Sequence, residues 1–319
     1  AMCVAYSGGL DSAVLLHLVA SLSSDAASTA ADTASASRPH DLPKKTTHKL
    51  AAYHVNHGIS KHANAWQAHC EAQANRYGIA FFSSQLQLSK QNQQSLEADA
   101  RDARYNELSA FAGNKYQVLL AQHQDDQAET FILQLKRGAG VKGLSCMPRQ
   151  YTNQAGVSFI RPLLDFSRVQ LLQYAKQEQL EWIEDESNQD QAFERNFVRH
   201  TIMPALNERW PQISKTIRRS ASHCASTQQV VDEYMRLIAK QVLRASSCAH
   251  IPALLEFESA TQKAFLRFWL ADFNQTSKSS AQLDSLIGIL MSDNQAKRLY
   301  LDALIVERCQ DTLLLHRAS

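Results

Sequence analysis

The sequence predicts an α/β fold in which helices cover both faces of a parallel sheet, followed by a smaller, mainly helical domain that ends in a β-hairpin. Up to about residue 215, short apolar runs alternate with longer helical segments, a pattern typical of parallel sheets. Glycine directly follows three of these helical segments, in the position where helices most often end. Beyond residue 215 the pattern becomes mainly helical, which indicates a second domain.

The elements follow from the local patterns in chain order. In the first domain, 1–215, we expect strands at 2–6, 50–55, 79–83 and 116–121, and helices at 13–22, 63–77, 96–112, 125–137, 166–178 and 197–207. A long helix at 213–244 leads into the second domain, 216–319, where we expect helices at 259–273 and 281–292 and strands at 298–307 and 312–316. Residues 24–49 are rich in Ala, Ser and Thr without hydrophobic periodicity, so we expect a flexible insertion.

The composition argues against several classes of protein. The net charge is only +2, so bulk charge does not predict nucleic-acid binding, and any RNA contact must come from local patches. The six cysteines form no C-x-x-C pair, which disfavours a disulfide framework or a zinc site and favours a cytoplasmic protein. No uncharged apolar run approaches the roughly 18 residues of a membrane span. The sequence leaves the oligomeric state open, a homodimer included.

The turn SGGLDS joins the first strand to the first helix. Gly8 and Gly9 allow the backbone to turn tightly and to approach a ligand closely. The helix that follows directs its unpaired N–H groups at that ligand, and phosphate is the natural one. The hydroxyl groups of Ser7 and Ser12 add hydrogen bonds. Asp11 has the wrong charge to attract phosphate, so we expect it to be either a helix N-terminal acid or a carboxylate that holds Mg²⁺.

Three carboxylates gather at the start of the helix at 125–137. Asp126 and Glu129 are three residues apart and share a face with each other, and Asp125 precedes them. The helix dipole alone explains acids in a first turn. However, the ends of parallel strands meet at one edge of a sheet, so this loop should lie beside the SGGLDS turn. Carboxylates there would repel phosphate unless Mg²⁺ or an ammonium group intervened, which favours a site for such a cation.

Basic residues cluster in three segments. Each cluster is either a solvated helix face or a contact for a nucleic-acid backbone. The first cluster is Arg101 and Arg104 on one helix. The second is Lys136 with Arg137 and Lys142 of the glycine-rich segment that follows it, and the third is Arg195 and Arg199 on another helix.

Together these blocks resemble the tRNA(Ile)-lysidine synthetases, a family of the PP-loop (N-type ATP pyrophosphatase) superfamily with an adenine nucleotide alpha hydrolase-like sheet. SGGLDS specifies only the superfamily, whereas RGAGVKGL at 137–144 and SNQDQAFERNFVR at 187–199 narrow the resemblance to the family. HVNHGIS at 54–60, ARDARY at 100–105 and RPLL at 161–164 extend it over nearly the whole chain outside 24–49. Many members carry a third, C-terminal domain, and many have histidine where this chain has Gln122.

The resemblance implies an ATP-dependent ligase. ATP adenylates the C2 oxygen of the wobble cytidine in the CAU anticodon of an isoleucine tRNA, pyrophosphate leaves, and the ε-amine of free L-lysine then displaces AMP to give lysidine. The residues implied at ATP are Ser7, Gly8, Gly9, Leu10, Asp11, Ser12 and His57, with Mg²⁺ held by Asp11 and Asp125. The catalytic residues implied are Asp11, Asp126, Glu129 and Arg195. Those implied at the tRNA are Arg101, Arg104, Lys136, Arg137, Lys142, Asn196 and Arg199.

Two other functions use the same features. A tRNA thiolase of the same fold would need catalytic cysteines at loop ends, whereas Cys3 lies in a predicted strand and Cys146 stands alone. A non-catalytic tRNA-binding module would tolerate the loss of Asp11 and Glu129. The retention of the whole SGGLDS turn together with three helix-start carboxylates favours an enzyme.

Overall fold

The computed structural model describes residues 1–32, 50–56, 58, 62–86, 93–184, 193–273, 280–292, 297–301 and 304–317. The chain divides into two compact units, Ala1–Ala225 and Ser226–Ser319. The division falls inside the long helix α9 (Ile213–Val242), and the boundary expected near residue 215 lies at the start of this same helix. In the described part of the chain, no helix combines the length and the apolar character that crossing a membrane would require.

A six-stranded sheet forms the centre of the first unit, in the order β3-β2-β1-β4-β6-β5. Only β5, at the edge, runs antiparallel to its neighbour. The strands are β1 (Met2–Ala5), β2 (Leu50–Asn56), β3 (Ala80–Gln85), β4 (Gln117–Leu119), β5 (Gln150–Thr152) and β6 (Ser158–Ile160). The four parallel strands predicted first along the chain are confirmed. β5 and β6 were not predicted. β4 is equally short, but it lies in a longer apolar run at 116–121, which the segments of β5 and β6 lack.

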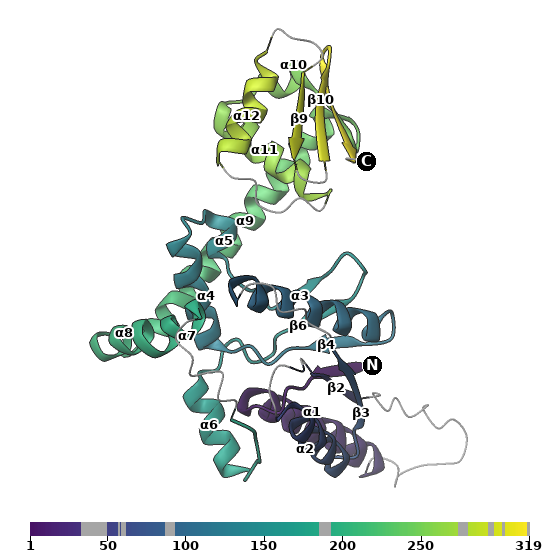
Figure 1. Ribbon diagram of the computed structural model, residues 1–319, viewed down its shortest axis with the longest axis vertical. Helices are drawn as coiled ribbons and strands as arrows, with labels where there is room; N and C mark the ends of the chain where they lie inside the picture. Colours follow the sequence, from purple (N-terminus) through teal and green to yellow (C-terminus); the bar gives the residue numbers. More distant parts are fainter. Residues whose placement is uncertain are drawn as a thin grey trace. The chain divides into compact units, whose positions relative to one another are not determined.

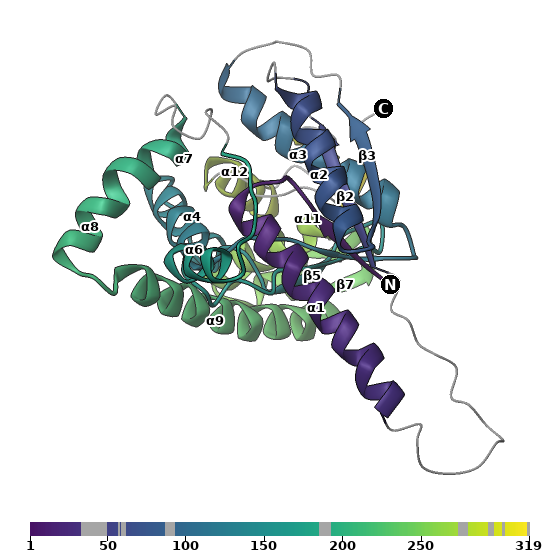
Figure 2. The same ribbon diagram turned by 90° about the horizontal axis from the view of Figure 1, so that it is seen from below.

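Helices cover both faces of this sheet, as predicted. Val4 and Ala52 pack with α1, α2 and α6 on one face, whereas Cys3 and Ala51 pack with α3 on the other. Figure 1 shows α3 on one side of the strands and α1 and α2 on the opposite side, and Figure 2 shows α1 running next to α6. These helices are α1 (Leu10–Asp32), α2 (Ala63–Arg76), α3 (Gln93–Ala112) and α6 (Arg168–Gln177).

The expected insertion at 24–49 begins as helix, because α1 continues to Asp32. Four of the nine residues at 24–32 are alanine, the strongest helix former, which helps the helix to continue beyond its apolar run. Residues 33–49 lie outside the described residues.

The remaining helices of the first unit lie beyond β4. The helix predicted at 197–207 is a succession of two α-helices with one π-helical turn between them. The elements are α4 (Gln124–Lys136), α5 (Val141–Leu144), α7 (Glu194–Phe197), the π-helix η3 (Val198–Ile202) and α8 (Met203–Arg209).

The second unit combines helices with an antiparallel sheet. The predicted hairpin corresponds to the pair β10 and β11 of this sheet. Its core includes Phe265, Trp269 and Leu313. The sheet has the order β7-β8-β11-β10-β9, so the strand predicted at 298–307 is two strands that pair at Leu301 and Leu304. The elements are β7 (Leu243–Ala245), β8 (Cys248–His250), α10 (Ile251–Leu255), α11 (Ser259–Ala271), α12 (Ser280–Leu290), β9 (Arg298–Leu301), β10 (Leu304–Cys309) and β11 (Thr312–Arg317).

Candidate active site at the carboxyl edge of the sheet

The turn after β1 leaves no room for a side chain at Gly8. The residue has a φ of +86°, and its carbonyl accepts a hydrogen bond from the Ile183 amide at 2.9 Å. A Cβ atom added there would lie 2.8 Å from Cys70 Sγ and 3.1 Å from Ile183 Cδ1. Both the conformation and the close approach therefore require glycine.

Hydroxyl groups and a carboxylate complete this turn. Ser12 Oγ donates to the Gly9 carbonyl at 2.9 Å and lies 3.1 Å from Ser7 Oγ, while Leu10 is buried in the core beneath. Asp11 is in the first turn of α1, and its Oδ1 atom is buried without a hydrogen-bond partner in the described structure. A buried, unpaired carboxylate oxygen beside this glycine turn fits a cation such as Mg²⁺.

His123 joins the turn to the loop after β4. It caps α4: Nδ1 accepts from the Asp125 amide at 3.2 Å, while the His123 amide donates to Asp126 Oδ2 at 3.0 Å. A neutral ring that accepts at Nδ1 carries its proton on Nε2. That atom lies 3.5 Å from Asp11 Oδ2 and 3.4 Å from Asp126 Oδ2. The two loops thus meet at one edge of the sheet, as the strand order predicts.

The carboxylates around His123 control its protonation. Burial would lower the pKa of His123, but the charges of Asp126, Asp11 and Asp125 outweigh burial and raise it. Burial likewise would raise the pKa of Asp126, and His123 and Arg195 reverse that effect and lower it. Asp126 therefore stays ionised and acts through its charge.

Asp126 and Glu129 bind two arginines from the segment that follows Phe193. Arg195 donates from Nε to Glu129 Oε2 at 2.9 Å and from Nη2 to Asp126 Oδ1 at 2.8 Å. Arg199 donates from Nε to Glu129 Oε1 at 2.6 Å and from Nη2 to Asp126 Oδ1 at 3.1 Å. The cations that compensate these carboxylates thus come from the chain itself, whereas the sequence suggested Mg²⁺ or an ammonium group.

Asp125 has a different partner from its neighbours. Its Oδ2 accepts a hydrogen bond from the backbone amide of Arg168 at 2.8 Å, which fixes the start of α6. Within the described residues no group of three His, Cys, Asp or Glu side chains could hold a metal ion. A Mg²⁺ ion would therefore take most of its ligands from phosphate and water, and Asp11 Oδ1 is the one buried carboxylate oxygen of the described residues that lacks a hydrogen-bond partner.

The other residues predicted for the site differ in their exposure and in their partners. Lys136 pairs with Glu194 at the surface, and Arg137 and Lys142 are exposed. Asn196 is buried beside the arginines, and His57 lies outside the described residues.

Arg101 and Arg104 flank Tyr105, each with its guanidinium carbon 5.8 Å from the ring centroid. Sequence reasoning did not assign a role to His123 or to Arg161, which is buried next to Tyr105. The only available signal for His123 was its position directly before the acids of α4, where helix caps occur.

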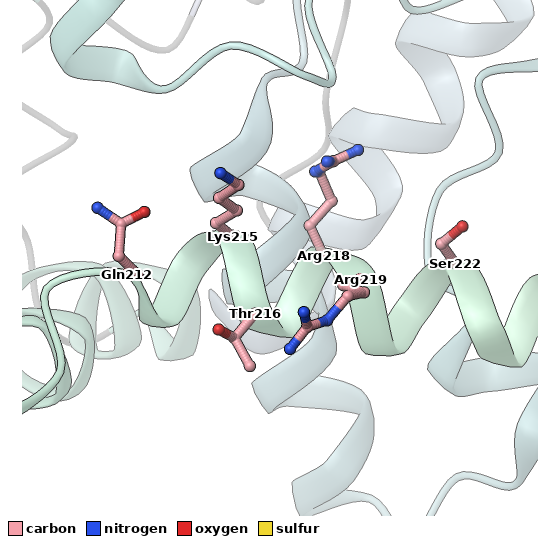
Figure 3. A pocket seen from close by; sticks show the side chains of 6 residues that line it. All are labelled: Gln212, Lys215, Thr216, Arg218, Arg219 and Ser222. Carbon is pink, nitrogen blue, oxygen red and sulfur yellow. The ribbon is translucent and has the colours of Figure 1, made fainter.

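A basic pocket of about 360 Å³ lies along the first turns of α9. Figure 3 shows Lys215 and Arg218 pointing to one side of the helix and Thr216 and Arg219 to the other. Arg218 donates to Asp165 at 2.6 Å. Gln212 and Ser222 complete the lining. Basic side chains interleaved with hydroxyl and amide groups are the usual contacts of a phosphate backbone.

Comparisons with known proteins agree with this architecture. A family model described as a PP-loop domain matches residues 1–206. The chain is 36% identical to the tRNA(Ile)-lysidine synthase of Haemophilus influenzae, over 99% of the chain and 69% of the relative. It is 41% identical to the enzyme of the same name from Serratia proteamaculans, over 89% of the chain and 61% of the relative. For the one from Yersinia pseudotuberculosis the identity is 39%, over 89% of the chain and 58% of the relative.

A solved structure shows the same fold. The U34-tRNA thiolase NcsA from Methanococcus maripaludis superposes with a TM-score of 0.52 at 17% identity, over 70% of this chain and 71% of that one. At this identity the similarity concerns the fold alone.

Proposed function

The chain belongs to the tRNA(Ile)-lysidine synthase family of PP-loop proteins, and we propose that it ligates free L-lysine to C2 of the wobble cytidine of the CAU-anticodon isoleucine tRNA. The PP-loop family implies the use of ATP, and the proposed products are lysidine, AMP and pyrophosphate. The observation that carries the proposal is the meeting of the SGGLDS turn with the His123 loop, where Asp11 Oδ1 is left unpaired.

The turn supplies the groups that hold pyrophosphate. The first N–H groups of α1 have no intrahelical partners and face the turn, and the positive end of the helix dipole adds to their attraction. Gly8 keeps this backbone within reach of a ligand. Ser7 offers a hydroxyl donor at the same place, and Ser12 could donate to a phosphate in exchange for its present bond to the Gly9 carbonyl. Donors fixed in this way stabilise the negative charge that develops on the leaving pyrophosphate.

Asp11 is the residue that would hold Mg²⁺. When bound, the ion would neutralise the pyrophosphate as it leaves. His123 keeps Asp11 Oδ2 in place, so that Oδ1 remains available. We base the metal site on Asp11 rather than on Asp125, since Asp11 Oδ1 is buried without a partner, whereas Asp125 is held by the Arg168 amide at the start of α6.

The cluster formed by Asp126, Glu129, Arg195 and Arg199 carries both charges that the second step needs. Ionised Asp126 and Glu129 attract the ammonium group of L-lysine, and the two arginines attract the phosphates of the adenylated RNA. Because all four carboxylate oxygens of Asp126 and Glu129 already accept hydrogen bonds, an incoming ammonium group must share these oxygens with the arginines. Lysine binding should therefore free arginine N–H groups for the phosphate. The pKa of Asp126 is lowered, so this carboxylate orients the amine and is a poor acceptor for its proton.

The tRNA would contact the first unit through its basic surface. We assign this role to Lys142, Arg137 and the pocket of α9, in which Lys215 and Arg219 are exposed. Lys136 is a weaker candidate because Glu194 pairs with it, although exposed pairs exchange at little cost.

Thiolase chemistry finds no support in the three cysteines whose thiols burial affects most. Burial raises the pKa of Cys3, Cys70 and Cys146 to about 12 in each case, so these side chains are thiols at neutral pH and poor nucleophiles.

Pyrophosphate release tests the proposed adenylation. We expect the protein to release pyrophosphate from ATP only when unmodified isoleucine tRNA is present, and we expect Asp11→Asn to abolish the release. The control is Glu178→Gln, which removes an exposed carboxylate at the C-terminal end of α6 and should keep the activity. Release without any RNA, or equal release by Asp11→Asn, would contradict the proposal.

A further inference from the structure

Arg161 carries a buried positive charge without a carboxylate partner among the described residues. It follows β6 and is 3% exposed. Its guanidinium donates to three neutral acceptors: Gln122 Oε1 at 3.1 Å, the Pro148 carbonyl at 2.7 Å and the Tyr105 hydroxyl at 3.4 Å. These bonds use three of the five guanidinium N–H groups and leave the charge, and a buried charge without a counterion is unfavourable. An anion beside Arg161 would supply the opposite charge.

An open pocket of about 410 Å³ gives such an anion access to Arg161. Arg101 and Tyr105 come from α3, and Tyr151 comes from β5, where its ring lies 5.1 Å from the guanidinium carbon of Arg161. Asp102 is the one carboxylate of the lining. The volume falls in the range of sites for small molecules or single nucleotides.

The lining of this pocket carries two arginines, Arg101 and Arg161, against one carboxylate, Asp102. Burial would raise the pKa of Tyr105, but Arg161, Arg104 and Arg101 outweigh burial and lower it. Burial raises the pKa of the Cys146 thiol in the lining to about 12, so this group is neutral and compensates none of the charge. The pocket therefore favours an anion over a neutral ligand.

The pocket adjoins the proposed active site through two consecutive residues. Gln122 bonds to Arg161, and the next residue, His123, lies with Nε2 3.5 Å from Asp11 Oδ2. A strand of RNA that places one nucleotide at Asp11 would carry its neighbour towards Arg161. Tyrosine and arginine side chains are the groups that hold splayed nucleotides of single-stranded RNA.

We propose that the pocket formed by Arg101, Tyr105, Tyr151 and Arg161 binds a phosphate-bearing nucleotide of the single-stranded anticodon loop, next to the nucleotide that reacts. This inference rests on the proposed function, because it takes RNA as the substrate. The carboxylate of L-lysine offers the same anionic chemistry, so the experiment must separate the two ligands.

The test compares the salt dependence of RNA binding between variants of the full chain. Arg101→Gln removes an exposed cation of the pocket, and Arg161→Lys keeps the charge but loses the fork of donors. The probe is an oligonucleotide with the sequence of the anticodon loop, and the slope of log Kd against log salt is measured. We expect the slope to fall by about 1 in Arg101→Gln, the loss of one phosphate contact. We expect Arg161→Lys to weaken binding at every salt concentration while the slope is retained.

The control is Arg76→Gln, in an exposed ion pair on α2 at the opposite face of the sheet, which should leave the slope unchanged. Thermal unfolding establishes that each variant is folded, and Arg101→Gln, at an exposed position, keeps the test valid if Arg161→Lys is unstable. Wild-type slopes in Arg101→Gln would overturn the inference, as would a change confined to the affinity for L-lysine. The proposed function would still stand if the wild-type protein forms lysidine. If the slope falls in Arg101→Gln but the wild-type protein forms no lysidine, the pocket would still be an RNA-binding site and the proposed function would be wrong.

Discussion

Replacing Glu129 with glutamine should destabilise the first unit markedly. The Glu129 side chain is 3% exposed and accepts hydrogen bonds from both Arg195 and Arg199. Breaking a buried ion pair costs about 3–5 kcal/mol, because the remaining charge loses its compensation. About a quarter of each arginine side chain reaches solvent, 25% and 24%, which moderates this loss. We therefore expect a decrease of about 2–4 kcal/mol in the free energy of unfolding, or roughly 5–15 °C in Tm for a unit of this size.

The structure provides a matched control at the surface. Asp165 also lies between two arginines, Arg149 and Arg218, but its side chain is 42% exposed. Exposed pairs contribute about 0–1 kcal/mol, so Asp165→Asn should change stability little. Urea unfolding followed by circular dichroism compares the two variants with the wild type. If Glu129→Gln were no less stable than Asp165→Asn, the buried ion-pair cluster would not stabilise the fold in the way argued here.

Three further predictions concern the turn, the histidine and the basic helix. Gly8→Ala should lower the free energy of unfolding in urea by about 2–4 kcal/mol, because it adds strain at positive φ and overpacking against Cys70 and Ile183. Gly78→Ala, which also has positive φ but no neighbouring atom within 4 Å of the added Cβ, should lower it by only about 1–2 kcal/mol. Equal losses in the two variants would refute the close approach at Gly8. The pKa of His123, measured by NMR, should exceed about 6.5 and should fall in Asp126→Asn; an unchanged pKa in the variant would refute the assigned cause. Because the pKa is raised in the folded state, the protonated His123 stabilises the fold fully at lower pH, and this stabilisation is lost as pH rises through the folded pKa. Lys215→Ala should reduce the salt slope of tRNA binding by about 1 without affecting ATP binding, and a wild-type slope would remove the α9 pocket from the interface.

The arrangement of the first unit could be predicted from the sequence because its signals are local. The apolar run of β1, the two glycines after it and the helix that follows lie within a few residues of one another, and the alternation of strands and helices fixes a parallel sheet. The strands that were not predicted, β5 to β8, are as short as β4 but lack an apolar run like that at 116–121, so tertiary pairing rather than pattern determines them.

The site was only partly predictable, because its interactions join distant parts of the chain. The meeting of Asp11 with the loop after β4 follows from the rule that strand ends share an edge. The pairing of Glu129 with Arg195 and Arg199 spans 66 and 70 positions, and no local pattern encodes it. The same is true of Arg161, whose burial depends on Gln122, Pro148 and Tyr105.

The most direct test of the central claim is the transfer of lysine to RNA. The protein is incubated with ATP, Mg²⁺, labelled L-lysine and unmodified CAU-anticodon isoleucine tRNA, and the label in the RNA is counted after alkaline treatment, which removes aminoacyl esters. The account predicts alkali-stable label with the wild-type protein and none with Asp11→Ala. A folded wild-type protein that binds this tRNA but transfers no lysine, or an Asp11→Ala variant that transfers as much as the wild type, would contradict it.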